Sequence, residues 1–322
     1  MKRIVSFFGE KDSALFQMLN KKASEYALSH NFEYCWHPMK SFSEAKVIDA
    51  LQNSDAGIID IEPYGESIFS RIADKTKLLV RFGVGFDQVD LKAARRFGIA
   101  VARTTGANMN AVAEMALMMM LMCKRRINNA QKQLREGIWV KDVGHELIGA
   151  TVGIIGYGAV GRRLAKLLKG FDCKIIIYDP YPKPDVIKED GVTLVPLEEL
   201  FKTADAVSIH VNYSETTHHM VNKDTLKLMK PTAVIVNTAR GNVIDEEALA
   251  ESLRMGRIAG TGLDVFAQEP LPLTSPLLTL ENTVLTPHVS SQTEEALWNI
   301  YKSAIDICTE FFEKGTSVHI LN

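Results

Sequence analysis

Residues 152–179 read VGIIGYGAVGRRLAKLLKGFDCKIIIYD. The run opens with apolar, β-branched residues, which are typical of a buried parallel strand. Glycines follow with the spacing G-x-G-x-x-G, at Gly156, Gly158 and Gly161, and apolar residues then recur at helical spacing. A second apolar strand ends on Asp179. Strand, glycine turn, helix, strand and terminal acid therefore stand in the order of a dinucleotide-binding βαβ unit.

Each residue of this turn has its own predicted role. Gly156 allows the tight turn, Gly158 leaves room for a pyrophosphate, and Gly161 lets the helix pack closely on the strand. The N–H groups and the dipole at the helix start favour the negative phosphates. Asp179 can accept hydrogen bonds from the adenosine ribose, and its charge would repel a 2′-phosphate. We therefore expect NAD as the cofactor rather than NADP. The competing interpretation is a purely structural βαβ unit.

Length and composition narrow the class of protein. A chain of 322 residues predicts two domains, and 46% hydrophobic residues, 24% charged residues and a net charge of −2 are typical of a globular protein. No basic block points to nucleic acid, and the longest apolar run, residues 115–123, is too short to span a membrane. The four cysteines are scattered and form no C-x-x-C pair, which is typical of a reducing cytosol. The N-terminus has charged residues too early for a signal peptide, so we expect a cytoplasmic protein.

Strands alternate with helices along the whole chain, which predicts an α/β fold with two doubly wound parallel sheets. A nucleotide-binding Rossmann domain is expected at 105–289. A discontinuous, flavodoxin-like substrate domain is expected at 1–104 and 290–322, because the helix predicted at 293–313 returns to the first domain. Prolines 180, 182 and 184 predict an irregular connection after Asp179.

Three titratable residues follow three different strands of the second domain, namely Arg240, Glu269 and His288. The ends of such strands meet at one edge of a parallel sheet, so these side chains can converge beside the cofactor. There the guanidinium can hold a carboxylate, the imidazole can exchange a proton with a carbonyl oxygen, and the carboxylate can orient the imidazole. That set suits hydride exchange between hydroxy and keto acids. Taken singly, each is more often a surface or capping residue.

A second glycine-rich stretch, RFGVGFDQVD at 81–90, follows a strand of the first domain. Its exposed N–H groups could bind an anion, but an ordinary strand-to-helix turn explains the same pattern. The adjacent histidines 218 and 219 could suggest a metal site. No cysteine or carboxylate cluster surrounds them in the sequence, so we expect no metal.

Several long motifs in order make the chain resemble the D-specific 2-hydroxyacid dehydrogenases over nearly its full length. They are RFGVGFDQVD (81–90), TTGANMNAVAEMAL (104–117), GIWVKDVGHELIGATVGIIGYGAVGRRLA (137–165), THHMVN (217–222), VNTARGNVIDEEAL (236–249), GLDVFAQEPLP (262–272) and LTPHVSSQTEEA (285–296). The resemblance implies an NAD-dependent enzyme that interconverts a small D-2-hydroxy acid and its 2-keto acid in an interdomain cleft. It also implies a homodimer built on the nucleotide domain, to which an arm around Trp139 contributes.

The resemblance also implies roles for individual residues. The catalytic set would be Arg240, Glu269 and His288, and the substrate carboxylate would be held at Arg81, Val84 and Gly85. Further cofactor contacts would come from residues of the glycine turn and of the later strand ends: Ala159, Val160, Val211, Asn212, Thr217, Thr238, Ala239 and Asp264, the last at the nicotinamide carboxamide. Asn212 stands where the family usually has proline, which leaves the detail of the adenine-side loop open.

Two other functions compete with this interpretation. One is a non-catalytic, NAD-responsive protein like the corepressors that resemble this family, although the full catalytic set argues against it. The other is a 3-phosphoglycerate dehydrogenase. Against it stand the lack of room after residue 322 for the regulatory domain that many of these carry, and the loop IEPYGE (61–66), which has two acids and no basic residue for a phosphate. Tyr64, Phe82 and Trp298 are candidates for the substrate side-chain pocket.

Overall fold

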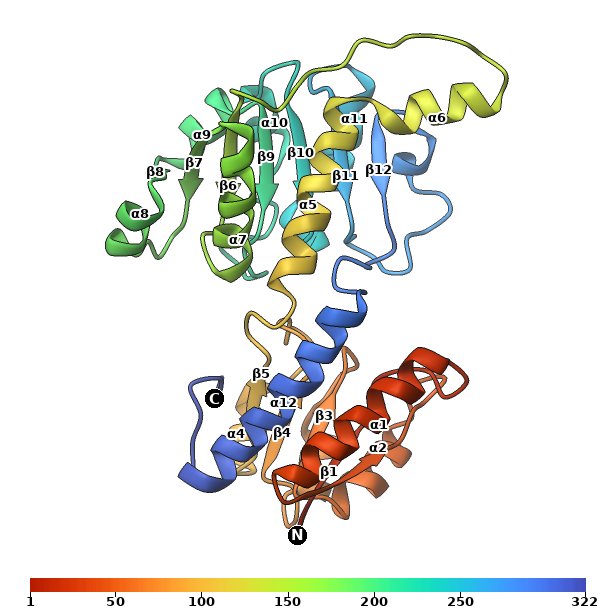
Figure 1. Ribbon diagram of the computed structural model, residues 1–322, viewed down its shortest axis with the longest axis vertical. Helices are drawn as coiled ribbons and strands as arrows, with labels where there is room; N and C mark the ends of the chain where they lie inside the picture. Colours follow the sequence, from red (N-terminus) through yellow and green to blue (C-terminus); the bar gives the residue numbers. More distant parts are fainter. The chain divides into compact units, whose positions relative to one another are not determined.

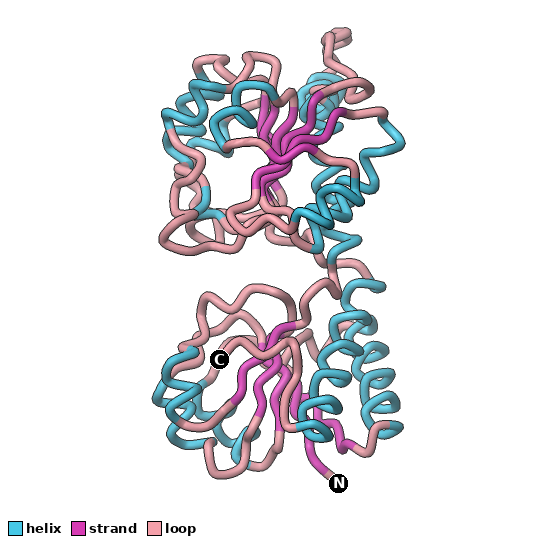
Figure 2. Tube along the Cα trace, turned by 90° about the vertical axis from the view of Figure 1, so that its left-hand side faces the viewer, coloured by secondary structure: helices cyan, strands magenta, loops and turns pink.

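A computed structural model describes residues 1–322, and the chain divides into two compact units. Unit 1 comprises residues 1–108 and 292–322, and unit 2 comprises residues 109–291. Figures 1 and 2 show that each unit has its own sheet with helices on both faces. Both sheets consist entirely of parallel pairs, as the alternation of strands and helices predicts.

Unit 1 has a five-stranded sheet in the order β2-β1-β3-β4-β5. Its strands are β1 (Lys2–Ser6), β2 (Phe32–Trp36), β3 (Ala56–Ile59), β4 (Leu78–Arg81) and β5 (Ala100–Arg103). The helices α1 (Ala14–Ser29) and α12 (Glu294–Lys314) pack on one face. The other face is covered by α2 (Glu44–Gln52), α3 (Glu66–Ile72) and α4 (Leu91–Arg96). The C-terminal helix thus belongs to the N-terminal sheet.

Unit 2 has a seven-stranded sheet in the order β12-β11-β10-β9-β6-β7-β8. Its strands are β6 (Thr151–Ile155), β7 (Lys174–Tyr178), β8 (Thr193–Leu194), β9 (Ala206–Ile209), β10 (Val234–Asn237), β11 (Gly260–Leu263) and β12 (Thr283–Leu285). The chain runs outward from β6 to β8 and then returns to β9 on the other side of β6. The switch point of the sheet therefore lies between β6 and β9, where open α/β sheets bind ligands.

Helices sandwich the second sheet as well. On one face lie α5 (Met109–Lys124) and α7 (Ala159–Leu168), and on the other lie α9 (Leu197–Thr203), α10 (Lys223–Leu228) and α11 (Glu246–Arg254). Between α5 and β6 the chain forms α6 (Ile127–Arg135) and then an irregular arm at 136–150. None of the helices combines the length and the apolar character that crossing a bilayer requires.

Residues 180–183 form the irregular connection that the prolines predict. From Pro184 onward the structure adds a helix that the sequence did not indicate, α8 (Pro184–Asp190), which is followed by Gly191 in a left-handed conformation. Proline fits the first turn of a helix because the N–H that it lacks would have no partner there. The helix is short and half-exposed, so it leaves little apolar periodicity in the sequence.

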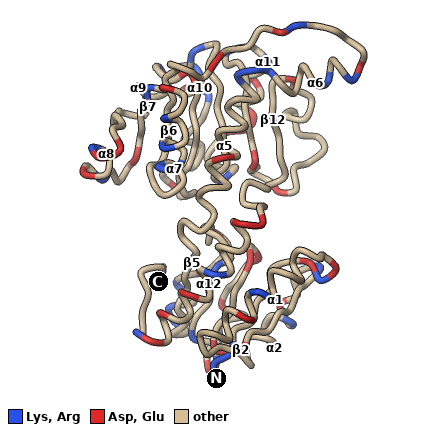
Figure 3. Tube along the Cα trace, in the orientation of Figure 1, with Lys and Arg blue, Asp and Glu red and all other residues tan.

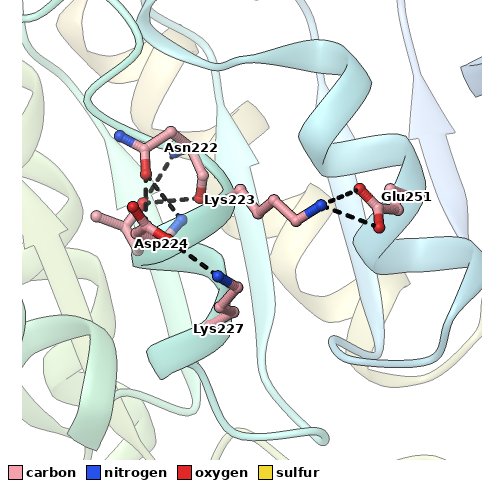
Figure 4. Close-up of polar contacts among 6 residues, drawn as sticks. Asn222, Lys223, Asp224, Lys227 and Glu251 are labelled. Atoms are coloured by element: carbon pink, nitrogen blue, oxygen red, sulfur yellow. Dashed lines mark hydrogen bonds and ion pairs between the residues drawn. The ribbon is translucent and has the colours of Figure 1, made fainter.

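Local capping fixes the start of α10, as Figure 4 shows. The Asn222 side chain accepts hydrogen bonds from the N–H groups of Asp224 (2.9 Å) and Thr225 (3.2 Å), and the Thr225 hydroxyl accepts one from the Asn222 N–H (2.9 Å). Lys223 then pairs with Glu251 of α11 at 3.1 Å, which joins two helices of the same face. Figure 3 shows that acidic and basic residues occur on both units.

Candidate active site

Arg240, Glu269 and His288 all lie in unit 2, each beyond the carboxyl end of one of three neighbouring strands. Arg240 follows β10, Glu269 follows β11, and His288 follows β12. Parallel pairing in register brings these three strand ends side by side. The convergence that the sequence predicts for strand ends is therefore present in the sheet.

The imidazole and the carboxylate form a direct pair. His288 Nδ1 lies 2.8 Å from Glu269 Oε2, and Glu269 Oε1 accepts a hydrogen bond from the Phe266 N–H at 3.0 Å. Burial alone would raise the pKa of Glu269, but the hydrogen bonds from His288 and Phe266, together with the charge of Arg240, outweigh it and lower the pKa. Glu269 therefore stays ionised and holds a proton on Nδ1 of His288. The other ring nitrogen, Nε2, remains for proton exchange.

Arg240 is held by the turn that follows β10. The buried Asn237 side chain accepts a hydrogen bond from the Ala239 N–H and donates one to the Arg240 carbonyl, both at 2.9 Å. Arg240 Nη1 donates to the Ala239 carbonyl at 2.6 Å. A Cβ added to Gly241 would lie 1.9 Å from the Phe266 carbonyl carbon, so only glycine lets this turn pack on the segment that leads to Glu269. Asn237 is not among the site residues that the sequence predicts.

His288 has an unusual backbone conformation, with φ of 54°, in the left-handed region. A backbone hydrogen bond holds it there, because the His288 N–H donates to the Asp264 carbonyl at 2.8 Å. Asp264 is fully buried and its carboxylate binds the same loop. Oδ1 accepts hydrogen bonds from the Thr286 hydroxyl (2.5 Å) and the Val289 N–H (2.8 Å), while Oδ2 accepts from the Ser290 N–H (2.9 Å) and the Ser290 hydroxyl.

These four hydrogen bonds occupy the lone pairs of the Asp264 carboxylate. The contact with the nicotinamide carboxamide that the family resemblance implies for Asp264 stays a prediction. The structure gives the residue a positioning role, because it ties the loop that carries His288 to the end of β11. Thr286 and Ser290, which complete this arrangement, carry no signal in the sequence beyond their short polar side chains.

The glycine turn lies at the switch point of the sheet. Gly156 has φ of +93°, and a Cβ there would lie 2.7 Å from the His210 carbonyl carbon beyond β9. A Cβ on Gly161 would lie 2.2 Å from the Gly156 carbonyl oxygen, whereas Gly158 faces open space. Gly158 also gives α7 no side-chain cap, so the N–H groups of Ala159 and Val160 are left for a ligand. This geometry suits a pyrophosphate.

Asp179 lies at the end of β7, next to the glycine turn. Its carboxylate accepts hydrogen bonds from the N–H groups of Tyr157 (2.6 Å) and Tyr181 (2.7 Å), which fix its position. After β9, Val211 is buried and Asn212 is exposed. The Thr217 hydroxyl donates to the Asn212 carbonyl at 2.8 Å and accepts from the Ser214 N–H at 2.8 Å, so it shapes this loop from within.

Thr238 offers a further polar group at this edge of the sheet. Thr238 is 9% exposed, and its hydroxyl is buried without a hydrogen-bond partner. Buried hydroxyl groups nearly always have a partner, so this one fits a polar group that binds beside β10. Together with the open glycine turn and the fixed Asp179 carboxylate, it shows that the residues present fit a dinucleotide.

The residues expected to hold the substrate carboxylate lie in unit 1, beyond the end of β4. Gly83 has φ of +124°, and its N–H donates to the Thr104 hydroxyl at 3.0 Å. The N–H groups of Val84 and Gly85 have no hydrogen-bond partner within the protein. Arg81 is buried and donates to the Phe82 carbonyl (2.5 Å) and to Asp60 (3.3 Å).

The two adjacent histidines stack on each other, with ring centroids 3.9 Å apart, and His218 Nδ1 lies 3.3 Å from the Tyr213 hydroxyl. No group of three or more His, Cys, Asp or Glu side chains in the chain is arranged to hold a metal ion.

Comparison with known proteins gives a consistent result. The model of the family described as D-isomer specific 2-hydroxyacid dehydrogenase, NAD binding domain, matches residues 117–290. A glyoxylate reductase of Korarchaeum cryptofilum is 39% identical over 81% of this chain and 80% of its own length. A D-3-phosphoglycerate dehydrogenase of Synechocystis is 39% identical over 80% of this chain but 48% of its own length.

Among solved structures, a glyoxylate reductase from Paecilomyes thermophila superposes with a TM-score of 0.85, at 28% identity, over 99% of this chain and 98% of that one. The matched region of the family model contains the glycine turn, Asp179 and all three catalytic candidates. The fold, the strand-end geometry and these matches lead to one conclusion: the chain belongs to the D-isomer specific 2-hydroxyacid dehydrogenase family.

Proposed function

We propose that this protein is an NADH-dependent reductase of a small 2-keto acid, which it converts to the D-2-hydroxy acid, and that the same site runs the reverse oxidation. The observation that carries the proposal is the 2.8 Å pair between His288 Nδ1 and Glu269, at the same sheet edge as Arg240 and the dinucleotide turn. This set supplies a proton donor, a group that orients it and a cation for a carboxylate.

In this mechanism NADH, when bound at the glycine turn, supplies the hydride. Arg240 binds the keto acid carboxylate and polarises the neighbouring carbonyl. His288 donates the proton on Nε2 to the carbonyl oxygen and takes it back in the reverse reaction. Glu269 stabilises the charged imidazole that precedes proton donation. The N–H groups of Val84 and Gly85 are proposed as further donors to the substrate carboxylate.

The preference for NAD over NADP is also a proposal, and it rests on Asp179. Two backbone N–H groups fix this carboxylate beside the glycine turn. There it can accept the ribose hydroxyls and would repel a 2′-phosphate. Thr238, whose hydroxyl lacks a partner, is proposed to contact the nicotinamide side.

For the substrate we favour glyoxylate and related short keto acids, because relatives named glyoxylate reductase match over most of their length. The D-3-phosphoglycerate dehydrogenase of Synechocystis is equally identical over a similar share of this chain, so 3-phosphohydroxypyruvate is the second candidate. The two differ in the phosphate, for which loop 61–66 offers two acids and no basic side chain.

A homodimer through unit 2 is proposed from the surface of α6 and the arm. Large apolar side chains are exposed there, among them Trp139 (81% exposed) and Val143 (86% exposed). Exposed apolar patches of this kind usually mark an interface. Light scattering should give twice the chain mass, and Trp139→Ser should shift the equilibrium toward monomer. We also propose that the enzyme works in the cytoplasm, on the pattern of its cysteines.

The direct test of the function is steady-state oxidation of NADH with glyoxylate, hydroxypyruvate, pyruvate, branched keto acids and 3-phosphohydroxypyruvate. We expect turnover with short, unphosphorylated acids and its loss in His288→Gln. NADH binding without turnover of any keto acid would instead support a non-catalytic NAD-responsive protein. A strong preference for the phosphorylated acid would support the phosphoglycerate branch.

A further inference from the structure

The short helix α8 is attached to the rest of unit 2 largely through one side chain. None of its residues is buried, and only Val186 and Ile187 pack partly against the core. Asp190, its last residue, accepts hydrogen bonds from Arg162 Nε (2.9 Å) and from the Tyr157 hydroxyl (3.1 Å), both on the same carboxylate oxygen. No other side chain of α8 forms a hydrogen bond. The attachment of α8 therefore depends on Asp190.

Tyr157 contacts both ends of the segment 179–190. It belongs to the glycine turn and is 8% exposed. Its N–H donates to Asp179 Oδ2 at 2.6 Å, and its hydroxyl donates to Asp190 Oδ2. One residue of the turn that is proposed to hold the pyrophosphate is thus bonded to the first and to the last residue of this segment.

The segment carries the groups that surround the expected ribose site. Asp179 begins it, and the Tyr181 N–H donates the second hydrogen bond to that carboxylate, at 2.7 Å. Tyr181 stands three residues before the start of α8, so its position depends on where the helix is held. If α8 moved away, Asp179 would lose one of the two donors that fix it, and its carboxylate could turn away from the ribose.

The side chains around Asp190 have a defined charge at neutral pH. The hydrogen bond from Arg162 outweighs burial and lowers the pKa of Asp190, so the carboxylate is ionised. Burial, followed by the hydrogen bond to Asp190, raises the pKa of the Tyr157 phenol, which therefore remains a donor. An exposed ion pair alone contributes little, because water screens it. Here the carboxylate is 23% exposed and also accepts from a nearly buried phenol, which strengthens the contact.

We propose that Asp190 is a positioning residue for the dinucleotide, which acts through Tyr157 and Arg162 to hold the segment 179–190 against the glycine turn. This arrangement sets the affinity for NADH. It also sets the discrimination against NADPH, because a fixed Asp179 carboxylate repels a 2′-phosphate more strongly than a mobile one. The inference rests on the proposed NADH-dependent function and adds to it a determinant of cofactor binding that takes no part in hydride transfer.

The test measures the dissociation constants of NADH and NADPH by fluorescence titration of the full chain without substrate. Asp190→Ala should weaken NADH binding about tenfold and NADPH binding less, so that the preference for NADH falls by about threefold or more. Tyr157→Phe, which removes only the hydroxyl, should change the preference in the same direction. In both variants kcat at saturating NADH should keep its wild-type value, because the reacting groups are untouched.

Glu189→Gln is the matched control for charge, because Glu189 is the neighbouring acid on α8, is exposed and forms no hydrogen bond. It should bind both dinucleotides like the wild type. Hydrogen exchange in the protein without cofactor supplies a readout that is independent of binding. The amides of residues 181–190 should exchange faster in Asp190→Ala than in the control.

Since Tyr157 and Asp190 act through one contact, the double variant Tyr157→Phe/Asp190→Ala should weaken NADH binding no more than Asp190→Ala alone. A merely structural role would lower the melting temperature, give additive effects in the double variant and weaken NADH and NADPH binding equally. Those results, or unchanged binding constants in both single variants, would overturn the inference in an enzyme that still reduces keto acids. A wild type that binds NADH but reduces no keto acid would instead refute the proposed function and leave the inference intact.

Discussion

The substitution Asp264→Asn examines the support of the active site rather than its reacting groups. The Asp264 carboxylate is fully buried and accepts four hydrogen bonds from residues 286–290, which surround His288. An amide at this position keeps the shape of the side chain but replaces one acceptor oxygen with an NH2 donor. Whichever oxygen is replaced, two hydrogen-bond donors of the loop then face another donor.

The cost follows from those two lost bonds. A hydrogen bond to a charged acceptor contributes about 1.5–3 kcal/mol, so the free energy of unfolding of unit 2 should fall by about 4 kcal/mol. That corresponds to a melting temperature about 10 °C lower. A displacement of His288 by about 1 Å would reduce the rate of keto acid reduction about 100-fold.

Thermal unfolding by circular dichroism and single-turnover reduction measure the two effects. Asp245→Asn is the matched control, because Asp245 caps α11 through the Ala248 N–H (3.1 Å), and asparagine caps a helix equally well. The reasoning would be refuted if Asp264→Asn melted like the control and raised only the KM for NADH. In that case Asp264 would serve the cofactor, as the family resemblance implies.

Further predictions concern the reacting groups and the cofactor. His288→Gln should lower keto acid reduction by about 100-fold or more while NADH binding, followed by fluorescence titration, is kept; a small effect would remove His288 from proton transfer. The pKa of Glu269 is lower in the folded protein than its ordinary value of 4.5. The ionised carboxylate therefore stabilises the fold above pH 4.5, and this stabilisation is lost as the pH falls through the lowered pKa. The acid limb of the rate profile should therefore lie below the ordinary range of glutamate, and Glu269→Gln should abolish that limb. Asp179→Ala should raise the ratio of NADPH to NADH efficiency by about tenfold, and an unchanged ratio would show that the ribose contact is wrong. Gly241→Ala should lower both the melting temperature and the turnover, because its Cβ has no room beside Phe266; normal turnover would mean that the Arg240 turn need not pack there.

Local patterns in the sequence predicted the nucleotide-binding unit well, for a physical reason. The roles of the glycines at 156, 158 and 161 depend on space within a short stretch of chain, so their spacing alone predicts the turn. The family and the two parallel α/β sheets expected from the sequence are confirmed. The convergence of strand ends could be inferred because parallel strands always place their carboxyl ends on one edge.

What the sequence could not show depends on tertiary contacts. Whether the Asp264 carboxylate faces a cofactor or the 286–290 loop is decided by a hydrogen-bond network between segments more than 20 residues apart. Asn237, which braces the Arg240 turn, looks like any polar residue after a strand. Short helices such as α3, α4 and α8 contain too few turns to produce a periodic pattern. The buried, unpaired hydroxyl of Tyr64 is visible only once its surroundings are known.

The measurement that tests the account most directly is single-turnover reduction of hydroxypyruvate with NADH deuterated at C4 of the nicotinamide, followed by isotope and chiral analysis of the product. The account predicts glycerate of D configuration with deuterium at C2 from the wild type, and none from His288→Gln on the same timescale. Product of L configuration, product without the label at C2, or equal single-turnover rates in the two proteins would contradict it.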